Sequence, residues 1–165
     1  GTTEEFLQKF LEDDEMQYFY DRGLIYYALS NPDMGSCYEI SSFLLSRCNK
    51  EKKNCILEKK TRDFDGPYHM LFRRKNYDVL QTAELCEQLF EAGADPNQAG
   101  EKNVLPIELM MALPFTEEEL HPLYDIWMKL PAVDLKLHTF DGKQPIYFAK
   151  KYKRKKLATW IKAQL

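Results

Sequence analysis

The chain has 165 residues, of which 44% are hydrophobic and 30% charged, so it is large and apolar enough to fold as one globular domain. Its formal net charge of −3 argues against a protein that binds nucleic acid over its whole surface. No apolar run has the length of a membrane span and no secretory signal opens the sequence, which predicts a soluble, cytoplasmic protein.

Three capping boxes, in which Ser or Thr is followed three residues later by Glu, mark predicted helix starts. They are Thr2 with Glu5, Ser36 with Glu39, and Thr116 with Glu119. The first opens a helical cap within residues 1–20, and the second opens a helix that continues to about Cys48. Another helix is predicted from Glu15 to Leu29, with Tyr27 on its inner face. It ends at Asn31-Pro32, because the residue before proline avoids helical geometry.

The four cysteines are predicted to be reduced and structural, since a chain of this length does not need disulfide bonds to fold. Cys86 falls inside an amphipathic pattern, where cysteine behaves as a small apolar residue. Cys48 and Cys55 flank a polar loop, so a bond between them remains the alternative in an oxidising compartment. Zinc is disfavoured because no Cys-x-x-Cys occurs and the three histidines are scattered. We expect no metal and no cofactor.

Three prolines, Pro67, Pro106 and Pro145, lie 39 residues apart, and each is followed by an aromatic or aliphatic residue. This spacing predicts an internal repeat. Each proline suits the first position of a helix, where its missing N–H costs nothing. Before the prolines lie three polar stretches, residues 58–66, 95–103 and 133–142, which we call the fingers. Asn103 and Gly142 suit tight turns in the last two, because both residue types tolerate positive φ.

Two segments carry a family resemblance. Leu89–Asn97 (LFEAGADPN) resembles the end of the ankyrin repeat, Leu-Leu-x-x-Gly-Ala-Asp-x-Asn. Asp141–Ala149 (DGKQPIYFA) resembles its opening, Gly-x-Thr-Pro-Leu-His-x-Ala, with Gln, Ile and Tyr in place of Thr, Leu and His. Pro67-Tyr68-His69 keeps the proline and the histidine of that opening. By this resemblance His69 hydrogen-bonds neighbouring backbone and ties adjacent repeats.

The resemblance implies an all-α fold, a helical-repeat solenoid of about four ankyrin-like helix-turn-helix repeats with an N-terminal helical cap. Residues 1–165 then form one domain, with the cap over 1–20. The repeats lie at roughly 21–57, 58–96, 97–135 and 136–165. The spacing of 39 exceeds the family's about 33, and the extra residues fall between the two helices of a unit, around 73–78 and 112–115.

In that family the concave face, made of the first helices and the fingers, is the recognition surface. The resemblance therefore implies a non-catalytic module that binds a protein partner and is a monomer in isolation. The candidate contact residues are Arg62, Asp63, Phe64, Asp65, Arg73, Arg74, Gln98, Glu101, Lys102, Met111, His138, Thr139, Phe140, Asp141 and Lys151. Four aromatic residues on the first helices would add an exposed patch if they face the same side: Tyr68, Phe72, Tyr147 and Phe148.

The residues also allow three other functions to be compared with protein binding. The basic run Lys150–Lys156 could bind an acidic partner or a nucleic-acid backbone, although a terminal repeat also needs a polar outer face. Nucleic acid is disfavoured because no known binding motif is present. A toxin-neutralising, immunity-type bacterial protein is the second alternative, because compact divergent ankyrin proteins often play such roles. An enzyme is disfavoured because no titratable residues stand at a recognisable catalytic spacing.

Overall fold

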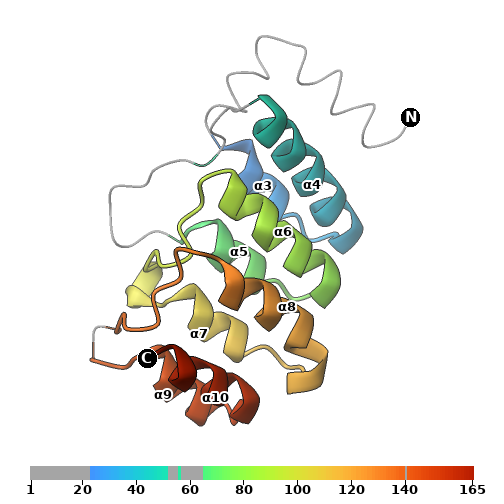
Figure 1. Cartoon of the computed structure of the whole chain (residues 1–165). Helices are drawn as coiled ribbons and strands as arrows, with labels where there is room; N and C mark the ends of the chain where they lie inside the picture. The colour runs from blue at the N-terminus through green and yellow to red at the C-terminus, as the bar shows by residue number, and fades with distance from the viewer. Residues whose placement is uncertain (1–22, 52–55, 57–64, 140) are drawn as a thin grey trace.

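The computed structural model describes residues 23–51, 56, 65–139 and 141–165, and every regular element in them is a helix (Figure 1). The elements are α3 (Leu24–Leu29), α4 (Met34–Glu51), α5 (Pro67–Phe72), α6 (Val79–Glu91), the 3₁₀-helix η1 (Glu101–Asn103), α7 (Pro106–Met111), α8 (Glu117–Lys129), α9 (Pro145–Lys151) and α10 (Lys155–Gln164). The predicted all-α class is therefore confirmed for this part of the chain. The predicted cap over residues 1–20 lies outside it.

The helices lie in two rows (Figure 1). The short helices α3, α5, α7 and α9 contact one another in chain order and form the short-helix row. The longer helices α4, α6 and α8 do the same in the second row, and α10 packs against α9 at the end of the stack. A short helix is thus followed each time by a longer one, and successive pairs lie side by side.

The prolines and turn residues fit this arrangement, whereas the helix predicted from Glu15 to Leu29 does not run through Gly23, whose φ is 96°, and α3 starts at Leu24. Pro67, Pro106 and Pro145 are the first residues of α5, α7 and α9. The two turn residues have positive φ, 59° at Asn103 and 78° at Gly142. Residues 73–78 and 112–116 connect the two helices of a pair, whereas the longer connections, 92–105 and 130–144, join one pair to the next.

The capping boxes had different outcomes. Thr116 and Glu119 cap α8 reciprocally: the Glu119 amide donates to Thr116 Oγ1 over 3.1 Å, and the Thr116 amide donates to Glu119 Oε2 over 3.0 Å. The prediction for Ser36 was wrong, because α4 begins two residues earlier. Asp33 precedes the helix, and its Oδ2 accepts from the Ser36 amide over 2.8 Å. Thr2 and Glu5 lie outside the described residues.

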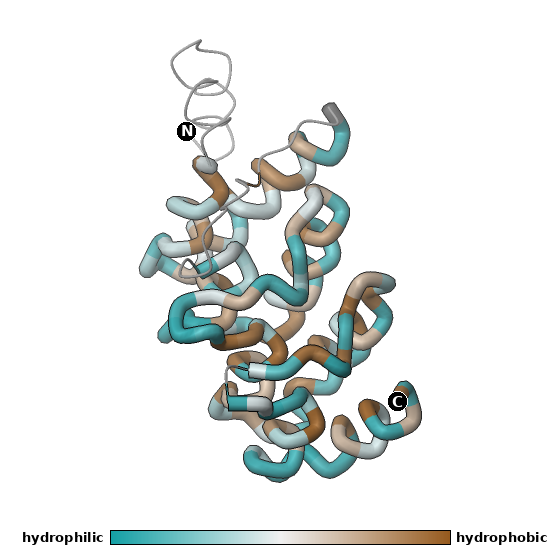
Figure 2. Tube along the Cα trace, turned by 90° about the vertical axis from the view of Figure 1, so that its left-hand side faces the viewer, coloured by the Kyte–Doolittle hydropathy of each residue, from teal (hydrophilic) through white to brown (hydrophobic). Residues whose placement is uncertain are grey.

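Aromatic packing joins the two rows in the core. The Trp127 side chain of α8 is fully buried, and its ring meets Tyr68 and Phe72 of α5 edge-on, with centroid distances of 5.0 and 5.5 Å. Leu89 of α6 is also fully buried. Brown, hydrophobic segments recur along the helices in Figure 2 and alternate with hydrophilic ones, as expected of helices that bury one side. Cys37, Cys48 and Cys86 are buried in this core, and Cys55 lies outside the described residues.

His69 ties α5 to the finger of the next unit, as predicted. The Gly66 amide donates to His69 Nδ1 over 3.0 Å, so the ring proton lies on Nε2, which contacts the Val104 carbonyl at 2.8 Å. Gly100 packs against this histidine, and a Cβ there would come within 2.7 Å of Nε2. Asp65 adds a parallel tie, because its Oδ1 accepts from the Glu101 amide over 3.0 Å.

This buried histidine gives the fold an expected pH dependence. Burial lowers the pKa of His69 below its ordinary value of 6.5, against the opposing effect of the Val104 carbonyl. The unfolded chain therefore binds the proton more readily than the folded one. The contribution of the neutral, buried His69 to the free energy of unfolding is therefore complete above pH 6.5. It is lost as the pH falls through the lower pKa of the folded state. We expect urea unfolding at pH 7.5, 6.5 and 5.5 to give decreasing free energies of unfolding.

The control for this dependence is a pair of substitutions. His69→Gln should flatten the slope between pH 7.5 and 5.5, because the titrating group is gone. His121→Gln, at an exposed histidine of α8, should leave it unchanged. A His69→Gln variant with the wild-type slope would show that another group controls this pH range.

Two arginines tie neighbouring units from the loops that follow short helices. Arg74, in the loop after α5, donates from Nη1 to the carbonyls of Leu29 and Asn31 at the end of α3, over 2.7 and 2.6 Å. Arg154, in the loop after α9, donates to three carbonyls at the end of α7 and in the loop beyond it. Each guanidinium satisfies carbonyls that a helix end leaves without partners.

Candidate functional site

Side chains of opposite charge gather on the short-helix row. Arg73, at the end of α5, pairs with Asp65 over 3.1 Å between Nε and Oδ2. Glu108 of α7 lies within electrostatic range of Arg73, Asp141 and Lys151, so it connects α5, α9 and the third finger. We call Asp65, Arg73, Glu108, Asp141 and Lys151 the charged cluster. It spans three consecutive units.

The electrostatics of the cluster differ from its centre to its edge. Burial raises the pKa of Glu108, the nearby Lys151 opposes that shift, and Asp141 adds to it. The hydroxyl of Thr139 donates to Asp141 Oδ1 over 2.6 Å and lowers the pKa of that exposed carboxyl. Glu108 is therefore a half-buried charge without full compensation, whereas Asp65 and Asp141 are already held by hydrogen bonds from the fingers.

One aromatic side chain extends this surface. Tyr147 of α9 is 41% exposed, and Lys143 Nζ lies 4.4 Å from its ring centroid. The larger aromatic patch expected from the sequence does not form, because Tyr68, Phe72 and Phe148 are buried in the core. For Tyr27 the prediction of an inner face was wrong, because its side chain is 73% exposed on α3.

A cleft of about 440 Å³ lies beside the charged cluster, between the end of α3 and α5. Its apolar lining comes from Leu29, Pro32 and Met70. Its charged lining is Asp65, Arg73, Arg74 and Lys75. We call it the cationic cleft. It brings three of the predicted contact residues, Asp65, Arg73 and Arg74, to one place.

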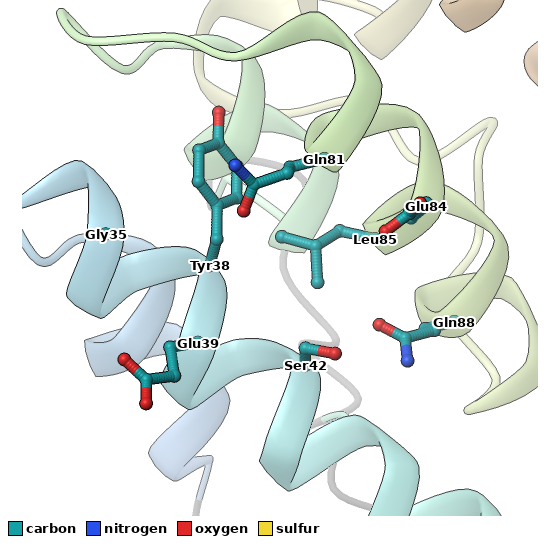
Figure 3. A pocket seen from close by; sticks show the side chains of 8 residues that line it. All are labelled: Gly35, Tyr38, Glu39, Ser42, Gln81, Glu84, Leu85 and Gln88. Carbon is teal, nitrogen blue, oxygen red and sulfur yellow. The ribbon is translucent and has the colours of Figure 1, made fainter. Parts of the chain in front are cut away.

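A second concavity, a groove of about 390 Å³, lies between the longer helices α4 and α6 (Figure 3). Its lining is polar, with Ser42 of α4 and Gln88 of α6 on opposite sides. Glu39 points away from the middle of the groove, so it does not converge with Glu84 on a shared position. The groove therefore presents no paired carboxylates for acid–base chemistry.

The structure removes two residues from the predicted contact set and changes the role of a third. Met111 is fully buried, because it faces the core at the end of α7. Thr139 is buried as well, and its hydroxyl is used within the third finger by Asp141 and by the Lys143 amide. Arg74 donates from its Nη1 to two backbone carbonyls at the end of α3, so its main role is structural.

The other predicted contact residues divide into two groups. Glu101, Lys102 and His138 are exposed on the fingers, and Gln98 is half-buried in the second finger. Those outside the described residues are Arg62, Asp63, Phe64 and Phe140.

Sequence reasoning missed Glu108 and Lys143. Glu108 stands two residues after Pro106, and His69 stands two residues after Pro67, so the two occupy the same repeat position. Aligning the units by their prolines would have singled out this position as one where the side chain varies from unit to unit. Lys143 has no such signal, since only the folded finger places it over Tyr147.

Comparison with models of known protein families gives no match, and comparison with curated proteins gives none either. In the part of the chain that the structure describes, no group of three or more His, Cys, Asp or Glu side chains is placed to hold a metal ion. Nor does any described helix have the length and apolarity needed to cross a lipid bilayer.

Proposed function

We propose that the chain is a divergent ankyrin-like solenoid that binds a protein partner without catalysing a reaction. The partner contacts the face formed by the short-helix row and the fingers. Four features support the fold proposal: the 39-residue proline spacing, the two rows of helices, the bridging histidine and the positive-φ turn residues. As a monomer, such a stack offers an extended rigid surface, and binding to it costs little ordering entropy.

The charged cluster is the observation that carries the function. Its charges come from the end of α5, from α7 and α9, and from the fingers, so they belong to three consecutive units rather than to one helix. Glu108 keeps a carboxylate half-buried at the centre of this face, where desolvation opposes its charge. A cationic group of a partner would compensate it, and close charge pairs at interfaces steer association and select partners.

The alternative site in the basic run Lys150–Lys156 has less support. Arg154 donates to three backbone carbonyls, and Lys151 acts electrostatically on the carboxylates of Glu108 and Asp141. Glu117 also lies beside the run, because its carboxylate accepts from the Lys156 amide over 2.7 Å. Phosphates would meet fewer available cations here than the sequence suggests.

The test is affinity capture from a lysate of the source cells, with two charge reversals compared against the wild type. Glu108→Lys changes the centre of the charged cluster. Glu84→Lys is the matched control, because Glu84 is an exposed glutamate of α6 on the groove between the longer helices. Equal thermal unfolding of both variants is established first. We expect Glu108→Lys to lose the captured partner and Glu84→Lys to retain it.

A further inference from the structure

The lining of the cationic cleft carries more positive than negative charge. Arg73, Arg74 and Lys75 face it with three cations, and Asp65 contributes one carboxylate. The whole chain, by contrast, has a formal net charge of −3. Asp33 acts on Arg74 from outside the lining, but its Oδ2 is already used by the Ser36 amide. The cleft therefore attracts an anionic group.

The donors of the cleft are partly fixed in advance. Arg74 is half-buried, and its Nη1 is held by the carbonyls of Leu29 and Asn31. Its Nε is buried and has no hydrogen-bond partner among the described residues. Arg73 is oriented by Asp65, and its side chain is 41% exposed. A ligand would therefore meet charges that need little further ordering.

Three residues of the lining are apolar. Leu29, Pro32 and Met70 line the same cleft; Leu29 is fully buried, Met70 is half-buried and Pro32 is exposed. An inorganic anion would leave this apolar surface exposed to water. A carboxylate next to an aliphatic side chain suits both parts of the lining, since its charge meets the guanidinium groups and its neighbour covers the apolar residues.

We propose that the cationic cleft receives a Glu or Asp side chain of the partner, flanked by an aliphatic residue. This inference rests on the proposed protein-binding function and names the chemistry of one contact within it. The cleft and the charged cluster share Asp65 and Arg73, so the occupant would lie at one end of the same recognition face.

The test is an NMR titration of the full chain with three probes. The first is the capped peptide acetyl-Leu-Glu-Leu-amide, the second is its Gln analogue, and the third is inorganic phosphate. We expect saturable shifts of the Arg73, Lys75 and Met70 signals with the Glu peptide. The Gln peptide should bind about tenfold more weakly, because it lacks the charge-assisted hydrogen bonds.

Two double variants serve as a matched pair. Arg73→Gln with Lys75→Gln removes two exposed cations of the cleft and leaves the structural Arg74 in place. Lys155→Gln with Lys156→Gln removes two exposed cations of α10. We expect the cleft double variant to bind the Glu peptide about tenfold more weakly than the wild type does. The α10 double variant should bind it with unchanged affinity.

Several outcomes overturn the inference. They are an absence of saturable shifts in the cleft, equal affinity for the Glu and Gln peptides, or phosphate binding as tightly as the Glu peptide. The affinity of the variants for the captured partner tests this inference separately from the function proposed above. If the cleft variant keeps full partner affinity and Glu108→Lys loses it, the carboxylate contact is wrong and the binding face stands. If neither variant loses affinity, the binding face is wrong as well.

Discussion

Replacing Trp127 with alanine is expected to lower the free energy of unfolding by about 3–5 kcal/mol. The side chain is fully buried, and it joins the rows through ring contacts with Tyr68 and Phe72. Alanine would leave a cavity between α8 and α5 that these rings cannot fill without leaving their rotamers. For a protein of this size, a loss of that order is a large share of the total stability. Urea unfolding followed by circular dichroism measures it.

Two further variants locate the cause of this loss. Trp127→Phe keeps an aromatic ring and removes the buried Nε1–H, which has no hydrogen-bond partner among the described residues. We expect it to cost clearly less than Trp127→Ala, because it leaves a smaller cavity. Trp160→Ala, at a half-buried tryptophan of α10, should also cost clearly less than Trp127→Ala. Equal losses at the two tryptophans would contradict the packing described here.

Arg154→Ala should destabilise the fold by about 3 kcal/mol, because it removes a charge-assisted tie between two units. The guanidinium donates from Nε to the Met111 carbonyl over 3.0 Å, and from Nη2 and Nη1 to Leu113 and Phe115 over 2.7 Å each. Their loss leaves three partly buried carbonyls of the α7 end to find other donors. The sum of three separate bonds would overestimate the effect, since they act as one group.

The Arg154→Lys substitution distinguishes the effect of the positive charge from that of the guanidinium hydrogen bonds. Arg154→Lys keeps the positive charge but has no planar guanidinium group to reach three carbonyls. It should therefore be destabilised almost as much as Arg154→Ala. Lys155→Ala, one residue further along, removes an exposed charge and should stay within about 0.5 kcal/mol of the wild type. An Arg154→Ala variant as stable as Lys155→Ala would show that the hydrogen bonds contribute nothing.

Local signals in the sequence predicted several helix boundaries, although not the starts of α3 and α4. Proline at a helix start, a capping box at Thr116 and residues that tolerate positive φ each act through their own backbone geometry, so no tertiary information is needed. The wrong helix start at Ser36 also comes from a local signal. Asp33 offers an equally good side-chain cap three residues earlier, and the sequence does not decide between two caps that both satisfy backbone amides.

The candidate site was less predictable, because exposure depends on which side a short helix presents. Helices of six or seven residues make fewer than two turns, so their apolar periodicity does not define a face. Met111 was therefore placed on the surface although it is buried, and Glu108 was overlooked. The role of Arg74 depends on carbonyls more than 40 residues away, which no local pattern reveals.

The most direct test of the central claim is the affinity of the captured partner for the Glu108→Lys and Glu84→Lys variants, measured by calorimetry on equally stable proteins. If the partner binds the short-helix row and the fingers, Glu108→Lys should bind at least about tenfold more weakly than Glu84→Lys, as expected when a close charge pair at an interface is reversed. Wild-type affinity in Glu108→Lys, with the loss appearing in Glu84→Lys, would place the partner on the longer helices and contradict the account.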